Sequence, residues 1–372
     1  MGIKNNKFST FSLLILCSIV FTVSPIFVYA DDKKQENDEK TSGFLVLPVL
    51  GSSPETNFMF GGAVQYFFRE SGSGIETRPS TLTAVFIYTQ NKQIISLLEF
   101  DLYRRNEEFQ ITGGINYTKF PDKFYGIGNN TVEENEESYT PELTGFELNV
   151  RKRIYPGLYI GASYRLFNNS IIKTEEDGIL RNGSIPGSGT GKVSGIGFSA
   201  NYDTRDNIFS PSNGKYYSAS VNIYDKVFGG DYDFHDYVVN IRQYFPIFEN
   251  QVFAVQGYMK SVHGTPPFQM LSLFGGDSIM RGYYQGRFRD RNMIACQLEY
   301  RSSDWKSIGM IAFAGIGDVA DKFSNFKIDN FKHTLGFGFR YLVSKNEKVK
   351  IRMDFGFGKE TSGMYLSLNE AF

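Results

Sequence analysis

The stretch LGFGFRYLVSKNEKVKIRMDFGF, residues 335–357, carries the clearest signal of the architecture of this chain. In 335–343 and again in 349–357, a large apolar side chain stands at every second position. Apart from Leu342, the positions between them are small or charged: Gly336, Gly338, Arg340, Lys350, Arg352, Asp354 and Gly356. A period of two places apolar groups on one side of a sheet and polar or small groups on the other. The stretch therefore predicts two amphipathic strands.

Similar segments recur along the chain, and sixteen of them are predicted as strands. Many have about 10–12 residues, which is the length that a tilted strand needs to cross a bilayer, and an even count suits a bacterial outer-membrane barrel. The segments are 43–51, 58–69, 79–90, 93–104, 108–118, 141–153, 157–167, 192–204, 214–225, 233–245, 251–262, 291–301, 307–316, 333–343, 348–358 and 362–372.

The composition favours β structure and argues against a nucleic-acid partner. The 372 residues include 35 Phe, 23 Tyr and 38 Gly, which suits strands and turns. The 39 basic and 40 acidic side chains give a formal charge of −1, whereas binding to nucleic acid needs a basic surface. Removal of a leader that contains Cys17 would leave only Cys296, so we expect no internal disulfide.

The first thirty residues are predicted to be a secretory signal peptide. Lys4 and Lys7 precede an apolar run over residues 11–28, and Ala30 fits a small-residue cleavage site. The alternative is an uncleaved N-terminal anchor. Residues 31–42 are mostly charged, which predicts a short disordered lead. The barrel is then expected to occupy residues 43–372.

Alternation alone leaves a soluble β-sandwich or a soluble barrel open, because either buries its apolar faces inside. Three observations favour a membrane barrel instead. The leader exports the chain, the apolar faces carry many Phe and Tyr, and the opposite faces mix Arg, Asp, Glu and Gly. We therefore expect an all-β transmembrane antiparallel barrel in the outer membrane of a Gram-negative-type bacterium, with outer-membrane lipid around it.

The last residues, SGMYLSLNEAF, predict a final amphipathic strand that ends in Phe372. Such an ending resembles the signal by which barrels are recognised for insertion, so the barrel-assembly machinery is an expected partner in folding. Glu370 interrupts the apolar positions of this strand. The alternative is a last strand that happens to end in phenylalanine.

The stretch GGDSIMRGYYQGRFRDR, residues 275–291, is polar and glycine-rich and lies between two predicted strands. Together with NMIACQLEYR, 292–301, it resembles the hallmark region of the BamA/TamA superfamily of outer-membrane barrels, the bacterial surface antigen type. The residues that carry the resemblance are Gly275, Gly276, Arg281, Gly282, Tyr283 and Glu299. It implies a sixteen-stranded barrel in which the loop between strands 11 and 12 folds back into the lumen.

Two further regions agree with this resemblance. The opening LPVLGSSPETNFMFGG, 47–62, is similar to barrel starts in the superfamily. The stretch YDTRDNIFSPSNGKYYSASV, 202–221, looks like an earlier motif of the same superfamily. The residues that match this second motif are Asp203, Arg205, Asp206, Pro211 and Gly214.

A lumenal Arg281 requires a partner, because an unpaired charge away from water is costly. Glu299 has the strand parity of the polar face and offers a charge-assisted hydrogen bond. Gly282 is expected to permit a close approach of the backbone, and Tyr283 is expected to pack the tip. The loop is then predicted to brace or gate the lumen, and the alternative is a mobile surface loop.

The chain departs from the superfamily at two places. The resemblance implies an aspartate on the next strand that also faces the arginine, but Gly315 stands at the matching position. Asp318 follows with the opposite parity, so a weaker lock is expected. Members that assemble or translocate proteins carry periplasmic repeat domains before the barrel, and residues 31–42 leave no room for one.

Other motifs predict neither an enzyme nor a cofactor or metal site. The stretch GSGTGK, 187–192, lacks the first glycine and the Ser/Thr of a phosphate-binding loop. The three histidines show no ligand spacing, and the acidic run at 229–236 reads as a solvated turn. The expected role is insertion or translocation of client proteins or lipids. The alternative is a passive pore or structural barrel, and an outer-membrane enzyme is the third and least supported hypothesis.

Overall fold

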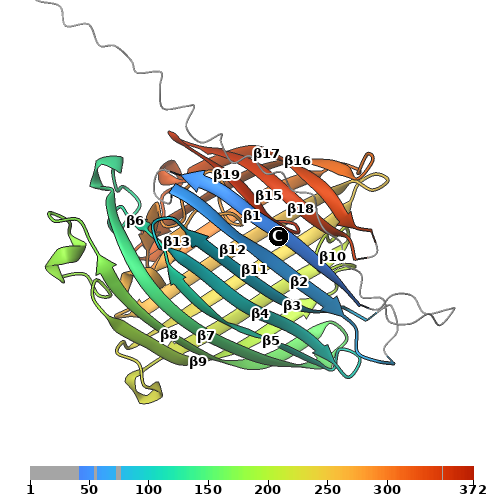
Figure 1. Cartoon of the computed structure of the whole chain (residues 1–372), viewed down its shortest axis with the longest axis horizontal. Coiled ribbons are helices and arrows are strands. Elements are labelled where there is room, and N and C mark those ends of the chain that lie inside the picture. Colours follow the sequence, from blue (N-terminus) through green and yellow to red (C-terminus); the bar gives the residue numbers. More distant parts are fainter. Residues whose placement is uncertain (1–41, 54–56, 73–76, 346) are drawn as a thin grey trace, which may run out of the picture.

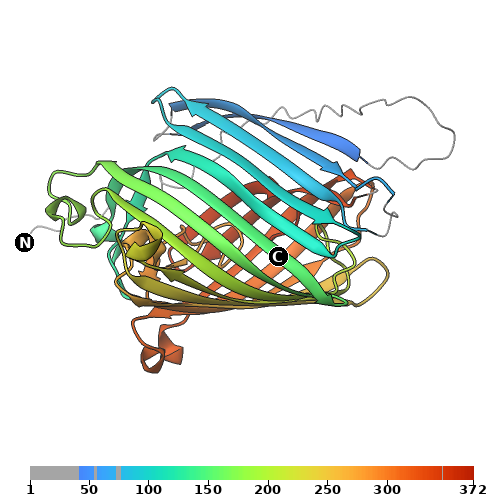
Figure 2. The same cartoon turned by 90° about the horizontal axis from the view of Figure 1, so that it is seen from below.

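A computed structural model describes residues 42–372, apart from 54–56, 73–76 and 346. The predicted signal peptide and residues 31–41 of the predicted lead lie outside this range. Residue 42, the last of the predicted lead, is the first residue of a strand. The long strands of this range form one antiparallel sheet that winds around a central axis (Figures 1 and 2).

The long strands follow one another in sequence order. They are β1 (Ser42–Ser53), β2 (Asn57–Phe68), β3 (Ser80–Thr89), β4 (Ile94–Arg104), β5 (Phe109–Lys119), β7 (Glu137–Tyr155), β8 (Leu158–Lys173), β9 (Gly191–Asp203), β10 (Gly214–Tyr224), β11 (Phe234–Pro246), β12 (Val252–Gly264), β15 (Asn292–Arg301), β16 (Ile308–Ala320), β17 (Lys332–Ser344), β18 (Val349–Gly358) and β19 (Thr361–Leu368). The short elements are β6 (Asp122–Phe124), β13 (Ser272–Phe274), β14 (Phe288–Asp290) and the 3₁₀ turns η1 (Glu133–Asn135), η2 (Leu180–Asn182), η3 (Lys226–Phe228), η4 (Phe268–Met270), η5 (Phe323–Asn325) and η6 (Ile328–Asn330).

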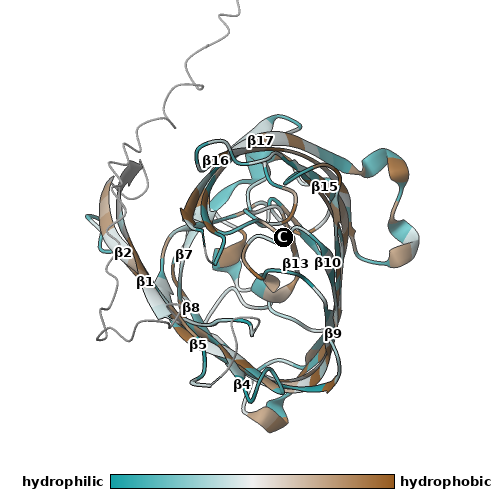
Figure 3. Ribbon diagram, turned by 90° about the vertical axis from the view of Figure 1, so that its right-hand side faces the viewer, coloured by the Kyte–Doolittle hydropathy of each residue, from teal (hydrophilic) through white to brown (hydrophobic). Residues whose placement is uncertain are grey.

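Each long strand pairs antiparallel with the next one along the chain, and β6 adds to the edge of β7. Seen along its axis, the sheet forms a ring of ribbons that encloses β13 and the C-terminal residues (Figure 3). The prediction of an all-β antiparallel barrel with sixteen strands is confirmed. Among the described residues, β1 pairs only with β2 and β19 only with β18, so these two edges form the seam of the barrel.

The two faces of the sheet differ as the alternation predicts. On β17, Leu335 is 64% exposed and Phe337 47% exposed, whereas Arg340 between the outward positions is 2% exposed. Such strands suit a bilayer because lipid contacts the apolar side chains while, away from the seam edges of β1 and β19, the ladder hydrogen bonds are satisfied within the sheet. Within the described residues, no helix is both long enough and apolar enough to cross a membrane.

The barrel has two unlike ends. The long-loop end carries the connections 120–136, 174–190, 265–291 and 321–331, and the short-turn end carries 105–108, 156–157, 247–251 and 345–348. At the long-loop end, β7 and β8 extend to 19 and 16 residues, beyond their predicted ranges 141–153 and 157–167. These extensions exceed the length that crosses a bilayer, so the two strands continue past it.

The C-terminal strand is shorter than the predicted range 362–372. β19 ends at Leu368, and Asn369 adopts a left-handed φ of 64°, a conformation that asparagine tolerates better than most residues. The chain then turns into the lumen, where Ala371 and Phe372 are buried against Tyr244, Val252 and Ala254 (Figure 3). These last residues therefore leave the barrel wall and fill the interior.

The segment between the eleventh and twelfth long strands, β12 and β15, also folds inward. It contains η4 and the small hairpin β13–β14, whose three residue pairs run from Ser272–Asp290 to Phe274–Phe288. β13 lies within the ring in Figure 3, in agreement with the predicted lumenal loop.

Candidate functional site

The site begins on the inner face of β15. Glu299 is fully buried and Arg301 is 4% exposed, while the intervening Leu298 and Tyr300 are about two-fifths exposed on the outer face. Gln297 shares the inner face and accepts a hydrogen bond from the backbone N–H of Met280 at 2.8 Å. The alternation of β15 thus points three polar side chains into the lumen, and two of them, Gln297 and Glu299, contact the lumenal loop.

Arg281 of the lumenal loop lies between two carboxylates. Its Nη2 donates to Glu299 Oε2 at 2.5 Å, and its Nη1 donates to Asp354 Oδ2 of β18 at 2.6 Å. The guanidinium also lies 3.7 Å from the centre of the Phe313 ring, and the Thr334 hydroxyl donates to the Arg281 carbonyl. Arg281 has no exposed surface, so these charge-assisted contacts replace its hydration.

The contacts of Arg281 belong to a closed ring of six buried side chains, called here the charged ring. Three guanidinium groups and three carboxylates alternate around it, so the formal charge is balanced. Successive members approach within 2.5 to 3.9 Å. In order, the members are Arg281, Glu299, Arg301, Glu370, Arg340 and Asp354.

The ring joins five parts of the chain. Glu299 and Arg301 come from β15, Arg340 from β17 and Asp354 from β18. Arg281 comes from the lumenal loop and Glu370 from the inward-turned C-terminal residues. Burial by itself raises the pKa of Glu370, but the Arg301 and Arg340 guanidinium groups outweigh it and hold the pKa below its ordinary value.

Arg352 supplies a second attachment between β18 and the loop. Its guanidinium contacts Asp354 at 3.1 Å, and it also donates to the side chain and backbone oxygens of Asp277, at 2.7 and 2.9 Å. Breaking any one buried pair leaves an uncompensated charge, which typically costs about 3–5 kcal/mol. The loop is therefore fixed to the wall at both Asp277 and Arg281.

The loop backbone lies directly on β18. Gly282 has a φ of +111°, and a Cβ there would lie 2.7 Å from the Phe357 nitrogen. A Cβ on Gly356 of β18 would lie 2.6 Å from the Arg281 carbonyl carbon. Both contacts are too short for any side chain, so glycine is required on both sides of this approach.

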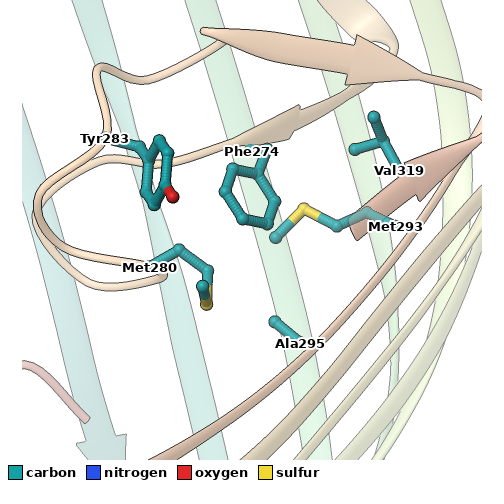
Figure 4. Packing of buried hydrophobic residues seen from close by; sticks show 6 residues of the cluster. All are labelled: Phe274, Met280, Tyr283, Met293, Ala295 and Val319. Carbon is teal, nitrogen blue, oxygen red and sulfur yellow. The ribbon is translucent and has the colours of Figure 1, made fainter. Parts of the chain in front are cut away.

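Tyr283 packs the loop against the wall. It belongs to a hydrophobic cluster within the lumen (Figure 4). Its hydroxyl donates to the His333 carbonyl at 3.1 Å and accepts from the Lys359 N–H at 3.0 Å. The other members of the cluster are Phe274, Met280, Met293, Ala295 and Val319.

The glycine pair shapes the start of the loop. Gly275 and Gly276 have φ values of +99° and +118°, and a Cβ on Gly275 would lie 2.4 Å from the Tyr284 carbonyl oxygen. The Gly276 N–H donates to the Tyr283 carbonyl at 3.0 Å. The chain therefore turns back on itself here, which brings Arg281 to the wall.

The second motif lies at the short-turn end, around the β9–β10 connection. Asp203 accepts hydrogen bonds from Arg205, at 2.9 and 3.0 Å, and from Arg78 at 2.9 Å. Asp206 binds the backbone of the following turn, and Gly214 begins β10 with a φ of +99°. These residues lie beyond contact distance of Arg281.

Arg301 links the two motifs. Its guanidinium contacts Glu299 of the charged ring and also donates to the backbone oxygens of Pro211 and Phe372, at 3.0 and 2.7 Å. Phe372 is thus placed in the interior beside the second motif. A role for Phe372 as an insertion signal stays a prediction.

The expectation that Arg281 lacks a second carboxylate partner is wrong. Asp318 lies away from Arg281 and pairs with Lys332 at 2.6 Å. The space beside Gly315 is taken by the Met280 side chain, since a Cβ there would lie 3.1 Å from its sulfur. Asp354 of β18 supplies the second carboxylate instead, and its inward parity was visible in the sequence.

Sequence reasoning also missed Arg340, Arg352 and Glu370. The parity of their strands identified the two arginines as inward-facing, but nothing in a single sequence says which inward charges meet. Glu370 interrupts the apolar pattern because it has left the strand. An acidic residue in an apolar terminal strand is a usable signal for such a departure.

The remaining candidates do not assemble into a catalytic or metal centre in the part of the chain that the structure describes. His235 and His263 lie on neighbouring strands with ring centroids 5.3 Å apart, which the sequence spacing did not indicate. No group of three or more His, Cys, Asp or Glu side chains is arranged to hold a metal among the described residues.

Comparison with known proteins agrees with the barrel fold. The sequence profile of the Omp85 superfamily domain matches residues 78–371. No curated protein matches the chain.

Two solved structures resemble the fold. The crystal structure of BamA from Haemophilus ducreyi lacking POTRA domains 1–3 aligns with a TM-score of 0.55 and 13% identity, over 89% of this chain and 70% of that one. CdiB from Acinetobacter baumannii aligns with a TM-score of 0.52 and 11% identity, over 89% of this chain and 60% of that one. This chain therefore spans less than two thirds of the length of CdiB.

Proposed function

The chain belongs to the Omp85 superfamily, and on that basis we propose that this outer-membrane barrel aids the insertion or translocation of protein or lipid at the bacterial outer membrane. The match also agrees with the prediction that the chain is not an enzyme. We also propose that the chain acts on protein or lipid clients and that the barrel-assembly machinery inserts the chain itself.

The observation that supports this function best is the seam. Among the described residues, neither β1 nor β19 has a ladder partner on its outer edge. Unpaired N–H and C=O groups are costly in lipid, so an edge strand favours any segment that can complete the ladder. Such a seam offers an incoming strand the hydrogen bonds that it lacks in the membrane.

The charged ring gives the other half of the mechanism. It fixes β15, β17 and β18 to one another and to the lumenal loop, so movement at the seam need not disturb this wall. The edge strands can then separate or thin the adjacent bilayer while the rest of the barrel keeps its shape. The lumenal loop acts as a brace in this scheme.

A reversible lock across the seam tests the proposal. Cysteines replace Leu45 of β1 and Leu368 of β19, which share one hydrophobic cluster, and serine replaces the exposed Cys296. We expect oxidation to slow the insertion of a test barrel protein into liposomes that contain this chain, and reduction to restore it. Insertion that is equally fast in the locked and reduced forms would contradict the proposal.

A matched lock within the wall serves as the control. Val64 and Ala84 lie opposite each other on β2 and β3, which are already paired. A disulfide there adds the same crosslink without closing the seam, so we expect no change in insertion.

A passive pore is the second candidate, and the lumen provides one observation for it. A cavity of about 600 Å³ lies on the inner faces of β2–β5 and β7–β11, and its lining is mainly polar. Planar bilayer recordings separate the two functions. A stable large conductance favours the pore, whereas a small and unsteady conductance favours a braced barrel that acts at its seam.

A further inference from the structure

The seam is held at its short-turn end by residues from the middle of the chain. Phe209, from the β9–β10 connection, is buried in one cluster with Leu45 of β1 and Val349 of β18. Leu368 of β19 and Val343 of β17 pack against the same cluster. Both edges of the seam therefore meet the same loop, although no ladder joins them among the described residues.

Polar contacts tie this loop to the last strand. The Glu370 N–H donates to the Phe209 carbonyl at 3.1 Å, and the Ser210 hydroxyl donates to the Glu370 carboxylate at 3.4 Å. Arg301 holds the Pro211 carbonyl at 3.0 Å. Since Glu370 and Arg301 both belong to the charged ring, the loop is fixed to the braced wall.

A second set of contacts reaches the strands on the other side of the seam. Arg78, which precedes β3, pairs with Asp203 at the base of the loop at 2.9 Å. Arg69, which follows β2, forms a two-point ion pair with Glu347 of the β17–β18 turn, at 2.6 and 3.1 Å. The Glu347 carbonyl accepts from the Asn207 side chain at 3.1 Å. Residues from both sides of the seam thus converge on the loop.

The loop keeps its shape through its own residues. The Asn207 Oδ1 accepts from the N–H groups of Phe209 and Ser210, at 2.8 and 2.7 Å, which forms a tight turn. A Cβ on Gly214 would lie 2.1 Å from the Thr204 carbonyl oxygen, so only glycine allows the loop to close on itself. Phe209 is therefore presented on a preformed support rather than on a free chain.

We propose that residues 204–213 form an internal clasp that sets the separation of β1 and β19 at the short-turn end. Phe209 and the Arg69–Glu347 pair are its positioning elements. The long-loop end of the seam lies a barrel length away from these contacts, so the clasp acts on the short-turn end. This inference deepens the proposed function, since it assigns control of the seam to a specific loop.

Distances between spin labels across the seam test the clasp in the full chain reconstituted in liposomes. Labels are attached to cysteines at Val46 of β1 and Leu366 of β19, with Cys296 replaced by serine. We expect Phe209→Ala to shift the label distance to longer values and to broaden its distribution. Phe209→Leu keeps an apolar side chain in the cluster and is expected to retain the wild-type distance.

A second test variant and a control allow the clasp to be tested even if Phe209→Ala fails to fold. Glu347→Gln removes the ion pair with Arg69 and is expected to lengthen the same distance by a smaller shift. Val227→Ala, at an 84% exposed position in the β10–β11 connection, is the matched control and is expected to change nothing. Wild-type label distances in both Phe209→Ala and Glu347→Gln, or in Glu347→Gln alone should Phe209→Ala not fold, would overturn the clasp.

The label distances also separate the clasp from the proposed function. They depend on the contacts around Phe209 and not on any client. If they lengthen while oxidation of the seam lock leaves insertion unchanged, the clasp stands and the insertion function falls. If they stay unchanged while the seam lock still blocks insertion, the clasp falls and the insertion function stands.

Discussion

The two halves of the barrel wall use the same kinds of inward-facing residues in different ways. On β15, β17 and β18, arginines and carboxylates join the charged ring, and the lumenal loop fills the space before them. On β2–β5 and β7–β11, similar side chains line a cavity of about 600 Å³. Inward charge alone therefore does not brace a barrel, because a loop must bring complementary charges to it.

Arg281 and Arg242 show this difference within one residue type. Arg281 contacts two carboxylates, whereas Arg242 donates to the amide oxygen of Asn240 at 3.2 Å and lies 5.4 Å from the Tyr216 ring centre. No ion pair of Arg242 is found among the described residues. The first arginine connects distant parts of the chain, and the second stays within its own neighbourhood.

Removing Arg281 should have the largest effect. Arg281→Ala leaves Glu299 and Asp354 buried with one cation fewer, so we expect the free energy of unfolding to fall by about 3–5 kcal/mol. Urea unfolding of the barrel in liposomes, followed by its heat-dependent mobility in gels, measures this loss. Arg242→Ala is the matched control, and we expect a much smaller loss because no carboxylate loses a cationic partner in this variant. Equal losses of unfolding free energy in the two variants would contradict the proposed difference between the two halves of the wall.

Filling the close approach between loop and wall should have an intermediate effect. Gly356→Ala places a methyl group against the Arg281–Gly282 peptide, so we expect a loss of about 1–3 kcal/mol in the same unfolding measurement. Gly257→Ala on β12 is the control, since a Cβ there meets nothing within 4 Å. If both glycines tolerate alanine equally well, the loop does not lie on β18.

Acidification should give the smallest and most selective effect. Because the Arg301 and Arg340 guanidinium groups outweigh burial and lower the pKa of Glu370 in the folded chain, this carboxylate stabilises the barrel above its unfolded pKa of about 4.3. That stability is lost as the pH falls through the lower folded pKa. We expect Glu370→Gln to be less stable than wild type at pH 7 and the difference to narrow below about pH 4. A difference that stays constant with pH would contradict this role of Glu370.

Much of the barrel could be predicted because alternation is a local property. The parity of residues 335–357 indicated which side chains face lipid and which face the lumen, and the count of alternating segments indicated the number of strands. The extensions of β7 and β8 escaped prediction, since strand pairing beyond the bilayer follows from contacts between neighbours. The inward turn at Asn369 escaped because it depends on partners deep in the lumen, such as Arg340 and Arg301.

The candidate site could be predicted only in part for the same reason. Glu299 has a parity that places it opposite Arg281, and the resemblance to a known superfamily singled out both residues. Asp354 has the same inward parity, but a single sequence gives no distance between β18 and a loop some seventy residues earlier. Closed networks such as the charged ring can therefore be predicted only when the curvature of the barrel is known.

Hydrogen exchange of the barrel in lipid bilayers tests the contrast between the halves most directly. With Arg281 in place, we expect the amides of β15–β18 to exchange more slowly than those of β2–β5. Arg281→Ala should speed exchange in β15–β18 and leave β2–β5 unchanged. Equal acceleration in both halves, or none in β15–β18, would contradict the claim that the charged ring braces one wall of the barrel.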